Sequence, residues 1–248
     1  MLAGRTVVVT GAARGVGLAI AEACARHGAA LIIADILEDL GAATTKALTF
    51  AGATARFIPV DLGDPASIEA FGADIAAREG RIQGLVNNAA IATNVGGARF
   101  EDIDMALWDR VMQVNVRGTW LVTRALSPLL ADGEARVVNM ASDTALWGPP
   151  RLLAYVTSKG AIISMTRSLA REFGPRGIGV VGIAPGIMRN EATDYVPAER
   201  HLEYETRRAV PGPQFPEDIV DVVAFALSAG ALPLTGQVLP VDAGFHYV

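Results

Sequence analysis

The sequence has few of the residues from which metal and nucleophile sites are usually built. It contains one cysteine, Cys24, and three histidines, none of them in a His-Glu-x-x-His arrangement. A catalytic zinc site, a Ser-His-Asp triad or an internal disulfide would therefore lack its parts. We predict no metal site, and we interpret Cys24, which stands between two alanines, as a small buried side chain in a reducing compartment.

Lysine is also rare, because Lys46 and Lys159 are the two lysines among 21 basic residues, and neither completes the Gly-Lys-Ser/Thr end of a P-loop. The net charge of -5 and the lack of a Lys/Arg run argue against a surface for nucleic acid. No apolar run approaches the roughly 18 residues of a membrane span, and the N-terminus does not resemble a signal peptide. We expect a cytoplasmic protein that binds neither nucleic acid nor membranes.

Short β-branched runs alternate with longer Ala-rich segments, which is typical of repeated βαβ units. The predicted strands are 6–10, 30–35, 56–61, 84–88, 136–141, 179–184 and 237–241. The predicted helices are 16–27, 38–51, 65–78, 107–130, 152–173 and 217–229. The pattern predicts one α/β domain over 1–248, a doubly wound, Rossmann-like fold with a seven-stranded parallel sheet and helices on both faces. Residues 186–216 fit no element, and a loop of this length is predicted to bind substrate.

A glycine-rich turn lies between the first predicted strand and the first predicted helix. Glycines there permit a tight turn and a close approach of a pyrophosphate, which the helix N-terminus favours. The turn residues expected to contact a dinucleotide are Gly11, Arg14, Gly15, Val16 and Gly17. The next strand ends in Asp35, whose carboxylate can accept hydrogen bonds from ribose hydroxyls and would repel a 2′-phosphate. The sequence therefore predicts NAD over NADP, although Arg14 could approach such a phosphate.

Asp61 ends the third predicted strand, and Leu62 follows it at the same edge of the sheet. We expect them to border the adenine, and a helix-capping aspartate is the alternative for Asp61.

Tyr155 and Lys159 are one helical turn apart in the predicted helix 152–173. Residues at i and i+4 share a helix face, so the phenol and the ammonium can reach the same ligand. A phenol with a pKa near 10 is a poor acid or base at neutral pH, and a neighbouring cation in a partly desolvated cleft favours its phenolate. The pair predicts a proton-transfer site with Tyr155 as the acid–base group, and a solvated helix face is the ordinary alternative.

Further motifs follow the other predicted strands. They are Asn87-Asn88-Ala89-Ala90, Ser142, Pro185-Gly186, Thr235-Gly236-Gln237 and Val241-Asp242-Ala243-Gly244. Together with the turn from Thr10 to Gly17, they resemble the motifs of the short-chain dehydrogenase/reductase family in kind, order and spacing over essentially the whole chain. Ala90 departs from the family's usual glycine, and Asn190 stands near where the family often has a threonine.

The resemblance implies that a hydride moves between nicotinamide and a carbonyl or secondary alcohol. Tyr155 would transfer the hydroxyl proton and Ser142 would hold the substrate oxygen. Lys159 would bind the nicotinamide ribose and lower the tyrosine pKa, and Asn115 would hold a water that links Lys159 to solvent. The further residues expected at the cofactor are Asn88, Ala89, Tyr155, Lys159, Pro185, Gly186, Met188 and Asn190. The resemblance also implies a homotetramer.

Substrate residues are expected in the segments that flank the four residues Asn115, Ser142, Tyr155 and Lys159, which stand where the family has its catalytic tetrad. They are Asn94, Val95, Thr144, Trp147, Leu152, Met188 and Tyr195. An apolar wall from Trp147, Leu152, Leu153 and Met188 favours an apolar or aromatic alcohol, with a cis-diol or a sugar also open. A carboxylate held by Arg151 or Arg189 would instead indicate a hydroxy acid.

Two rival functions remain beside a dehydrogenase. A dinucleotide-binding regulator without turnover is one, because a fold alone never establishes catalysis. A sugar-nucleotide epimerase or dehydratase is the other, and its glycine spacing differs from that of this chain. The residue after Ser142, Asp143, has no role in these interpretations.

Overall fold

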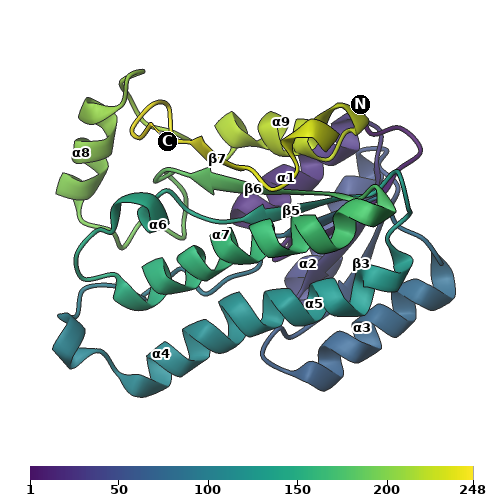
Figure 1. Ribbon diagram of the computed structural model, residues 1–248, viewed down its shortest axis with the longest axis horizontal. Helices are drawn as coiled ribbons and strands as arrows, with labels where there is room; N and C mark the ends of the chain where they lie inside the picture. The colour runs from purple at the N-terminus through teal and green to yellow at the C-terminus, as the bar shows by residue number, and fades with distance from the viewer. Residues whose placement is uncertain (248) are drawn as a thin grey trace.

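The structure, a computed structural model, describes residues 1–247 and is built on one parallel sheet with the strand order β3-β2-β1-β4-β5-β6-β7 (Figure 1). The strands are β1 (Thr6–Thr10), β2 (Ala30–Asp35), β3 (Ala55–Pro59), β4 (Gly84–Asn87), β5 (Arg136–Met140), β6 (Gly179–Pro185) and β7 (Val238–Val241). All six neighbouring pairs are parallel. The predicted fold class, a doubly wound seven-stranded sheet, is confirmed.

Helices cover both faces of the sheet. They are α1 (Gly15–Arg26), α2 (Glu38–Phe50), α3 (Pro65–Arg78), α4 (Met105–Met112), α5 (Thr119–Leu126), α6 (Thr144–Trp147), α7 (Leu153–Phe173), α8 (Ala198–Arg207) and α9 (Glu217–Ala226). Short 3₁₀ turns lie at Phe100–Asp102, Ser127–Leu129, Gly174–Arg176 and Ala229–Leu234. Within residues 1–247, no helix has both the length and the apolar character needed to cross a bilayer.

Successive residues of the buried strands feed two separate cores, which is why the strands are apolar on both faces. In β1, Val7 and Val9 join the core under α1, α2 and α9, which also holds the buried Cys24. Val8 joins the core under α3, α5 and α7. Figure 1 shows these two groups of helices on opposite sides of the sheet. The interpretation of Cys24 as a small buried side chain is confirmed.

The strand order reverses between β1 and β4. After β1 the chain adds β2 and β3 on one side, then crosses back to place β4 on the other side of β1. At such a switch point the connections leave in opposite directions and open a crevice at the carboxyl ends of the strands. The helices α6 and α8 lie at that same end of the sheet (Figure 1).

The structure corrects three element predictions. The helix predicted over 107–130 is divided into α4 and α5 by a π-helix at Gln113–Gly118. The segment 186–216, predicted to have no regular structure, contains α8. This helix is polar over most of its length and buries only His201 and Tyr204, so few apolar residues mark it in the sequence. The four-residue helix α6 was also not predicted, because so short a helix shows no periodicity.

Candidate active site

The turn after β1 is shaped by its glycines. Gly11 has a φ of +65°, and a Cβ at Gly17 would lie 2.0 Å from the carbonyl oxygen of Gly11. A larger residue at position 17 would therefore move the turn. The side-chain amide of Asn88, after β4, donates to the carbonyl oxygens of Thr10 at 2.9 Å and Gly11 at 3.1 Å. These bonds join the two strands of the switch point around the turn.

Asp35 holds a carboxylate beside this turn. Its Oδ2 accepts from the backbone N–H of Ala13 at 2.9 Å, and its Oδ1 accepts from that of Leu37 at 3.1 Å. Two carboxylate oxygens have about four lone-pair sites, so two remain for the hydroxyls of a ribose. The guanidinium of Arg14 lies 3.4 Å from the carboxylate of Glu191.

Asp61 lies just after β3, and its Oδ1 accepts from the backbone N–H of Gly63 at 2.7 Å. The helix cap proposed as its alternative role belongs to Asp64, which accepts from Ala66 N at 2.9 Å.

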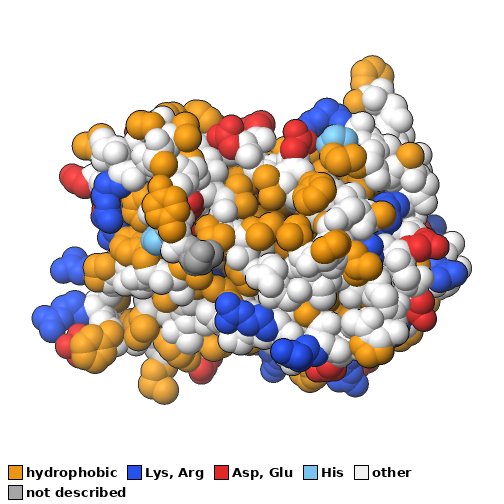
Figure 2. Space-filling view, turned by 45° about the horizontal axis from the view of Figure 1, so that its top comes forward, with side chains coloured by type: hydrophobic (Ala, Val, Ile, Leu, Met, Phe, Trp, Pro, Cys, Tyr) orange, Lys and Arg blue, Asp and Glu red, His pale blue; other side chains and the backbone are white. Residues whose placement is uncertain are grey.

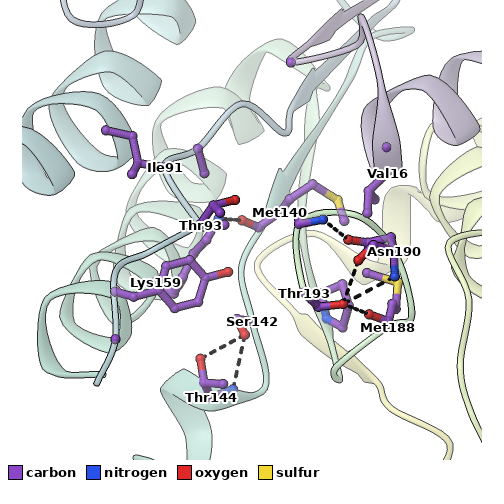
Figure 3. Close-up of a pocket in the computed structure, with 18 of the residues that line it drawn as sticks. Val16, Ile91, Thr93, Met140, Ser142, Thr144, Lys159, Met188, Asn190 and Thr193 are labelled. Atoms are coloured by element: carbon purple, nitrogen blue, oxygen red, sulfur yellow. Dashed lines mark hydrogen bonds between the residues drawn. The ribbon is translucent and has the colours of Figure 1, made fainter. Parts of the chain in front are cut away.

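Ser142, Tyr155 and Lys159 meet at the carboxyl end of β5. Thr144 donates to the Ser142 hydroxyl oxygen from its own Oγ1 at 2.9 Å and from its backbone N–H at 3.3 Å. The Lys159 Nζ lies 5.7 Å from the centroid of the Tyr155 ring and donates to the carbonyl oxygen of Met140 at 2.7 Å. Figure 3 shows Lys159, Ser142 and Thr144 around one space.

Burial has the largest effect on the pKa values of Tyr155 and Lys159. It raises the pKa of Tyr155, while a hydrogen bond with Ser142 acts in the opposite direction. Burial also lowers the pKa of Lys159 to about 8. From the protein's own groups alone, the net pKa of Tyr155 is therefore raised instead of lowered as expected, because desolvation disfavours the charged form of each group.

Asn115 lies within the π-helix and is almost completely buried. Its Oδ1 accepts from Ile91 N at 2.7 Å, and its Nδ2 donates to Ile91 O and to Ser158 Oγ, both at 3.1 Å. The side chain thus fixes the loop after β4 against α7 and does not line the cavity described next. A π-helix inserted into an α-helix frequently marks a functional site.

One cavity of about 1410 Å³ runs along the edge of the sheet from the glycine turn to Ser142 and Tyr155. It is lined by every residue that the sequence analysis assigned to the cofactor, namely Gly11, Arg14, Gly15, Val16, Gly17, Asp35, Asp61, Leu62, Asn88, Ala89, Tyr155, Lys159, Pro185, Gly186, Met188 and Asn190. The volume exceeds that of a typical pocket for one small ligand. The cavity therefore has room for a dinucleotide and a second molecule.

The segment 186–216 forms one wall of the cavity. The Asn190 Oδ1 accepts from Ala192 N at 2.8 Å, and the Thr193 hydroxyl donates to Met188 O at 2.5 Å. Figure 3 shows Met188, Asn190 and Thr193 beside Val16, across the cavity from Lys159. The Tyr195 hydroxyl donates to the carbonyl oxygen of Ala92 at 2.8 Å, so the segment reaches the loop after β4.

The expected substrate residues divide into two groups. Thr144, Trp147, Leu152, Met188 and Tyr195 line the cavity, as does Arg151. Val95 instead packs against Val111 and Ala154, and Asn94 is exposed in a left-handed turn with a φ of +56°. The prediction of Asn94 and Val95 as substrate residues is therefore wrong, since the direction of a side chain in an irregular loop cannot be derived from its position in the chain.

Two further candidates for substrate contact, one apolar and one charged, also lie outside the cavity. Leu153 is 44% exposed outside this cavity, and Arg189 pairs with Glu205 at 2.6 Å instead of facing it. Ile91, Thr93 and Thr193 line the cavity and were missed. Ile91 and Thr93 follow the predicted Asn-Asn-Ala-Ala motif by one and three residues, and Thr193 follows the predicted Asn190 by three; this proximity was the signal that could have found them.

Comparison with known proteins gives matches over almost the whole chain. The family described as "Enoyl-(Acyl carrier protein) reductase" matches residues 11–246. The "2-(S)-hydroxypropyl-CoM dehydrogenase 3" of Xanthobacter autotrophicus is 35% identical, with 98% of this chain and 97% of the relative covered. The "Cis-4-hydroxycyclohexanecarboxylate dehydrogenase" of Sinomonas cyclohexanicum is 32% identical with the same coverage of both chains.

Among solved structures, a "putative NAD(P) dependent gluconate 5-dehydrogenase" from Beutenbergia cavernae with bound NADP has a TM-score of 0.92 and 35% identity. Its match covers 98% of this chain and 97% of the other. Fold, site and relatives together define an oxidoreductase that acts on CH–OH groups. The chain belongs to the short-chain dehydrogenase/reductase family, whose members bind a nicotinamide dinucleotide, and the resemblance drawn from its motifs is confirmed.

Proposed function

We propose that this protein is an NAD(H)-dependent dehydrogenase that interconverts a secondary alcohol and its ketone. The observation that carries the proposal is the meeting of Tyr155, Lys159 and Ser142 at the end of a cavity that begins at the glycine turn. A dinucleotide with its pyrophosphate at the glycine turn would extend along this cavity and bring its nicotinamide beside the proton-transfer group, as hydride transfer to or from an alcohol requires.

In the oxidative direction, the Ser142 hydroxyl holds the substrate oxygen and Tyr155 accepts the hydroxyl proton. The C–H electron pair leaves as a hydride, for which a bound nicotinamide supplies the acceptor, and the C–O bond becomes a carbonyl. Thr144, which donates two hydrogen bonds to Ser142 Oγ, orients that hydroxyl so that its own hydrogen points to the substrate. Lys159 holds its ammonium beside the phenol and favours the phenolate.

The proposal of NAD over NADP rests on Asp35. A 2′-phosphate near its carboxylate would meet a like charge. Arg14, which lines the same cavity and could offset this charge, already has Glu191 as a partner. NADP bound at low occupancy in the Beutenbergia relative stands against this preference, as does the NADP of a second similar structure, a short-chain dehydrogenase from Burkholderia cenocepacia.

The proposed substrate is an apolar or aromatic alcohol, supported by the apolar wall of Trp147, Leu152 and Met188. A hydroxy acid is the second candidate, and Arg151 in the same wall favours it. Two of the relatives have a carboxylate in their named substrates, hydroxycyclohexanecarboxylate and gluconate. Measuring NADH formation with cyclohexanol and with cis-4-hydroxycyclohexanecarboxylate, in the wild type and in Arg151→Gln, distinguishes the two candidates.

We also propose one domain over the whole chain, with residues 186–216 as the substrate loop, in a homotetramer in the cytoplasm. Exposed hydrophobic side chains gather on the face formed by α9 and the segment before β7 (Figure 2), where Phe225 is 43% and Leu232 39% exposed. Such a patch suits contact with another copy. Light scattering on the purified protein gives the number of subunits, and a monomer would contradict the assembly.

The decisive experiment for the enzymatic proposal replaces Tyr155 with phenylalanine, which keeps the ring and removes the hydroxyl. We expect kcat to fall by roughly 10² to 10⁴ while the Kd for NAD is unchanged, because the phenol moves a proton and contributes little to dinucleotide binding. Tyr247→Phe, at a tyrosine that is 84% exposed, is the matched control and should keep full activity. Undiminished turnover in Tyr155→Phe would contradict the role proposed for Tyr155, whereas a wild type that binds NAD and turns over none of the alcohols would favour the non-catalytic rival.

A further inference from the structure

Asp143 is a buried acid beside the reacting groups that the proposed mechanism does not use. It follows Ser142 directly, its side chain is 1% exposed, and its backbone N–H donates to Pro185 O at 3.0 Å. Among residues 1–247, neither of its carboxylate oxygens has a hydrogen-bond partner of good geometry. A buried carboxylate without such bonds is costly, so its presence here requires an explanation.

The C-terminal tail, residues 242–247, faces this carboxylate. The His246 Nδ1 lies 3.0 Å from Asp242 Oδ2 and 3.8 Å from Asp143 Oδ2. Asp242 also accepts from the backbone N–H groups of Gly244, Phe245 and His246 at 3.0, 3.1 and 3.0 Å. The tail is therefore folded around Asp242, and its imidazole is held against Asp143.

Helix α8 packs on the same cluster from the substrate loop. Its Tyr204 ring stacks on Phe245 with 4.1 Å between centroids, and the Tyr204 hydroxyl accepts from Trp147 Nε1 at 3.1 Å. The Tyr204 hydroxyl also interacts with the Asp143 carboxylate. It favours the charged form of Asp143 and so lowers the pKa of that acid. Asp143 thus lies where the Ser142 loop, α8 and the tail come together.

A metal ion is a poor explanation of the cluster, although ligand atoms of Asp143, Asp242 and His246 lie within 4.8 Å of one another. The buried guanidinium of Arg208, just after α8, interacts with both carboxylates. It is fixed by hydrogen bonds to Ile187 O at 2.6 Å and Gly212 O at 2.9 Å. A fixed positive charge already offsets the two acids and would repel a metal cation.

The charge of Asp143 also extends to the acid–base group. Besides burial, the Asp143 carboxylate raises the pKa of Tyr155, because a nearby negative charge disfavours the phenolate. Burial raises the pKa of Asp143 itself to about 7, with Asp242 acting in the same direction and Tyr204 and Arg208 in the opposite one. Asp143 therefore changes its charge near neutral pH.

We propose that Asp143 is a positioning residue that keeps α8 and the C-terminal tail packed on the Ser142 loop through its interactions with Tyr204, Arg208 and His246. Its negative charge also opposes the phenolate form of Tyr155. One buried side chain then links the position of α8 to the ease with which the Tyr155 phenol gives up its proton. The inference goes beyond the proposed dehydrogenase activity, and its kinetic part rests on that activity.

The kinetic test uses Asp143→Asn, which keeps the shape and removes the charge. We expect the limb of the kcat profile that reports Tyr155 to move to lower pH by about one unit, since loss of a nearby negative charge favours the phenolate. Asp221→Asn, at a 74% exposed acid on α9, makes the same change in net charge and should leave the limb in place. Treatment with EDTA should not move it either; a shift on chelation would indicate a metal ion and overturn the proposal.

The structural test needs no turnover, so it can fail separately from the proposed function. In Asp143→Asn, backbone amides of α8 should exchange with deuterium at least several-fold faster, while those of α9 keep their rates. If that variant does not fold, Tyr204→Phe serves instead: it removes the hydroxyl that favours the charged acid, so the same limb should shift to lower pH by less. Unchanged exchange in α8, or a limb that stays fixed or moves to higher pH, would contradict the proposal.

Discussion

At the scale of single residues, the proposed reaction depends on how Tyr155 and Lys159 offset the desolvation of their charged forms. Burial raises the pKa of the phenol and lowers that of the ammonium to about 8. Each charge alone is unfavourable there, but a phenolate and an ammonium side by side offset one another. The two residues therefore work as a coupled pair, and neither has an independent pKa in the reaction.

Asp35 gives a prediction about cofactor choice. Asp35→Asn should weaken NAD binding about tenfold, since a hydrogen bond to a charged group contributes roughly 1.5 kcal/mol. The same change should strengthen NADP binding, because the repelling charge is gone. Fluorescence titration of both dinucleotides measures the two constants. Arg14→Gln is the companion variant, and a loss of NAD affinity there larger than in Asp35→Asn would show that the arginine and not the acid determines the choice.

At the scale of elements, the glycine turn and the helix it begins allow a matched pair of substitutions. Gly17→Ala places a Cβ 2.0 Å from the Gly11 carbonyl oxygen, whereas a Cβ at Gly160 in α7 meets nothing within 4 Å. We expect Gly17→Ala to abolish measurable dinucleotide binding and to lower the free energy of unfolding by about 1–3 kcal/mol. Gly160→Ala should raise that free energy by about 0.5–1 kcal/mol, as alanine does in helix interiors. Denaturant titration compares the two, and equal effects would refute the steric argument.

Most elements could be predicted from the sequence because buried parallel strands are apolar on both faces and leave a clear signal. Tyr155 and Lys159 could be paired because helical spacing alone determines that they share a face. The π-helix around Asn115 could not be predicted, since an extra residue in a helical turn barely alters the apolar pattern. The positions of Asn94 and Val95 and the helix α8 depend on tertiary packing, to which local sequence gives little access.

At the scale of the whole molecule, Asp143 makes stability depend on pH. Its folded pKa of about 7 lies above the ordinary value of 3.8, so the folded state holds this proton more tightly. The stabilisation is complete below pH 4 and is lost as the pH rises to about 7, at up to about 1.4 kcal/mol per pH unit. Asp143→Asn should therefore have a flatter stability profile than the wild type between pH 5 and 7, measured by urea unfolding. Parallel profiles would mean that Asp143 is ionised throughout this range.

The reversal of strand order between β1 and β4 separates two groups of cavity residues along the chain. The segments up to Asn88 supply the glycine turn, Asp35 and Asp61, whereas Ser142, Tyr155, Lys159 and the substrate loop all come later. Under the proposed function, substitutions in the second half could change which alcohol is accepted without altering the residues proposed to hold adenosine. Relatives built on this sheet could thus acquire new substrates while keeping the same adenosine site.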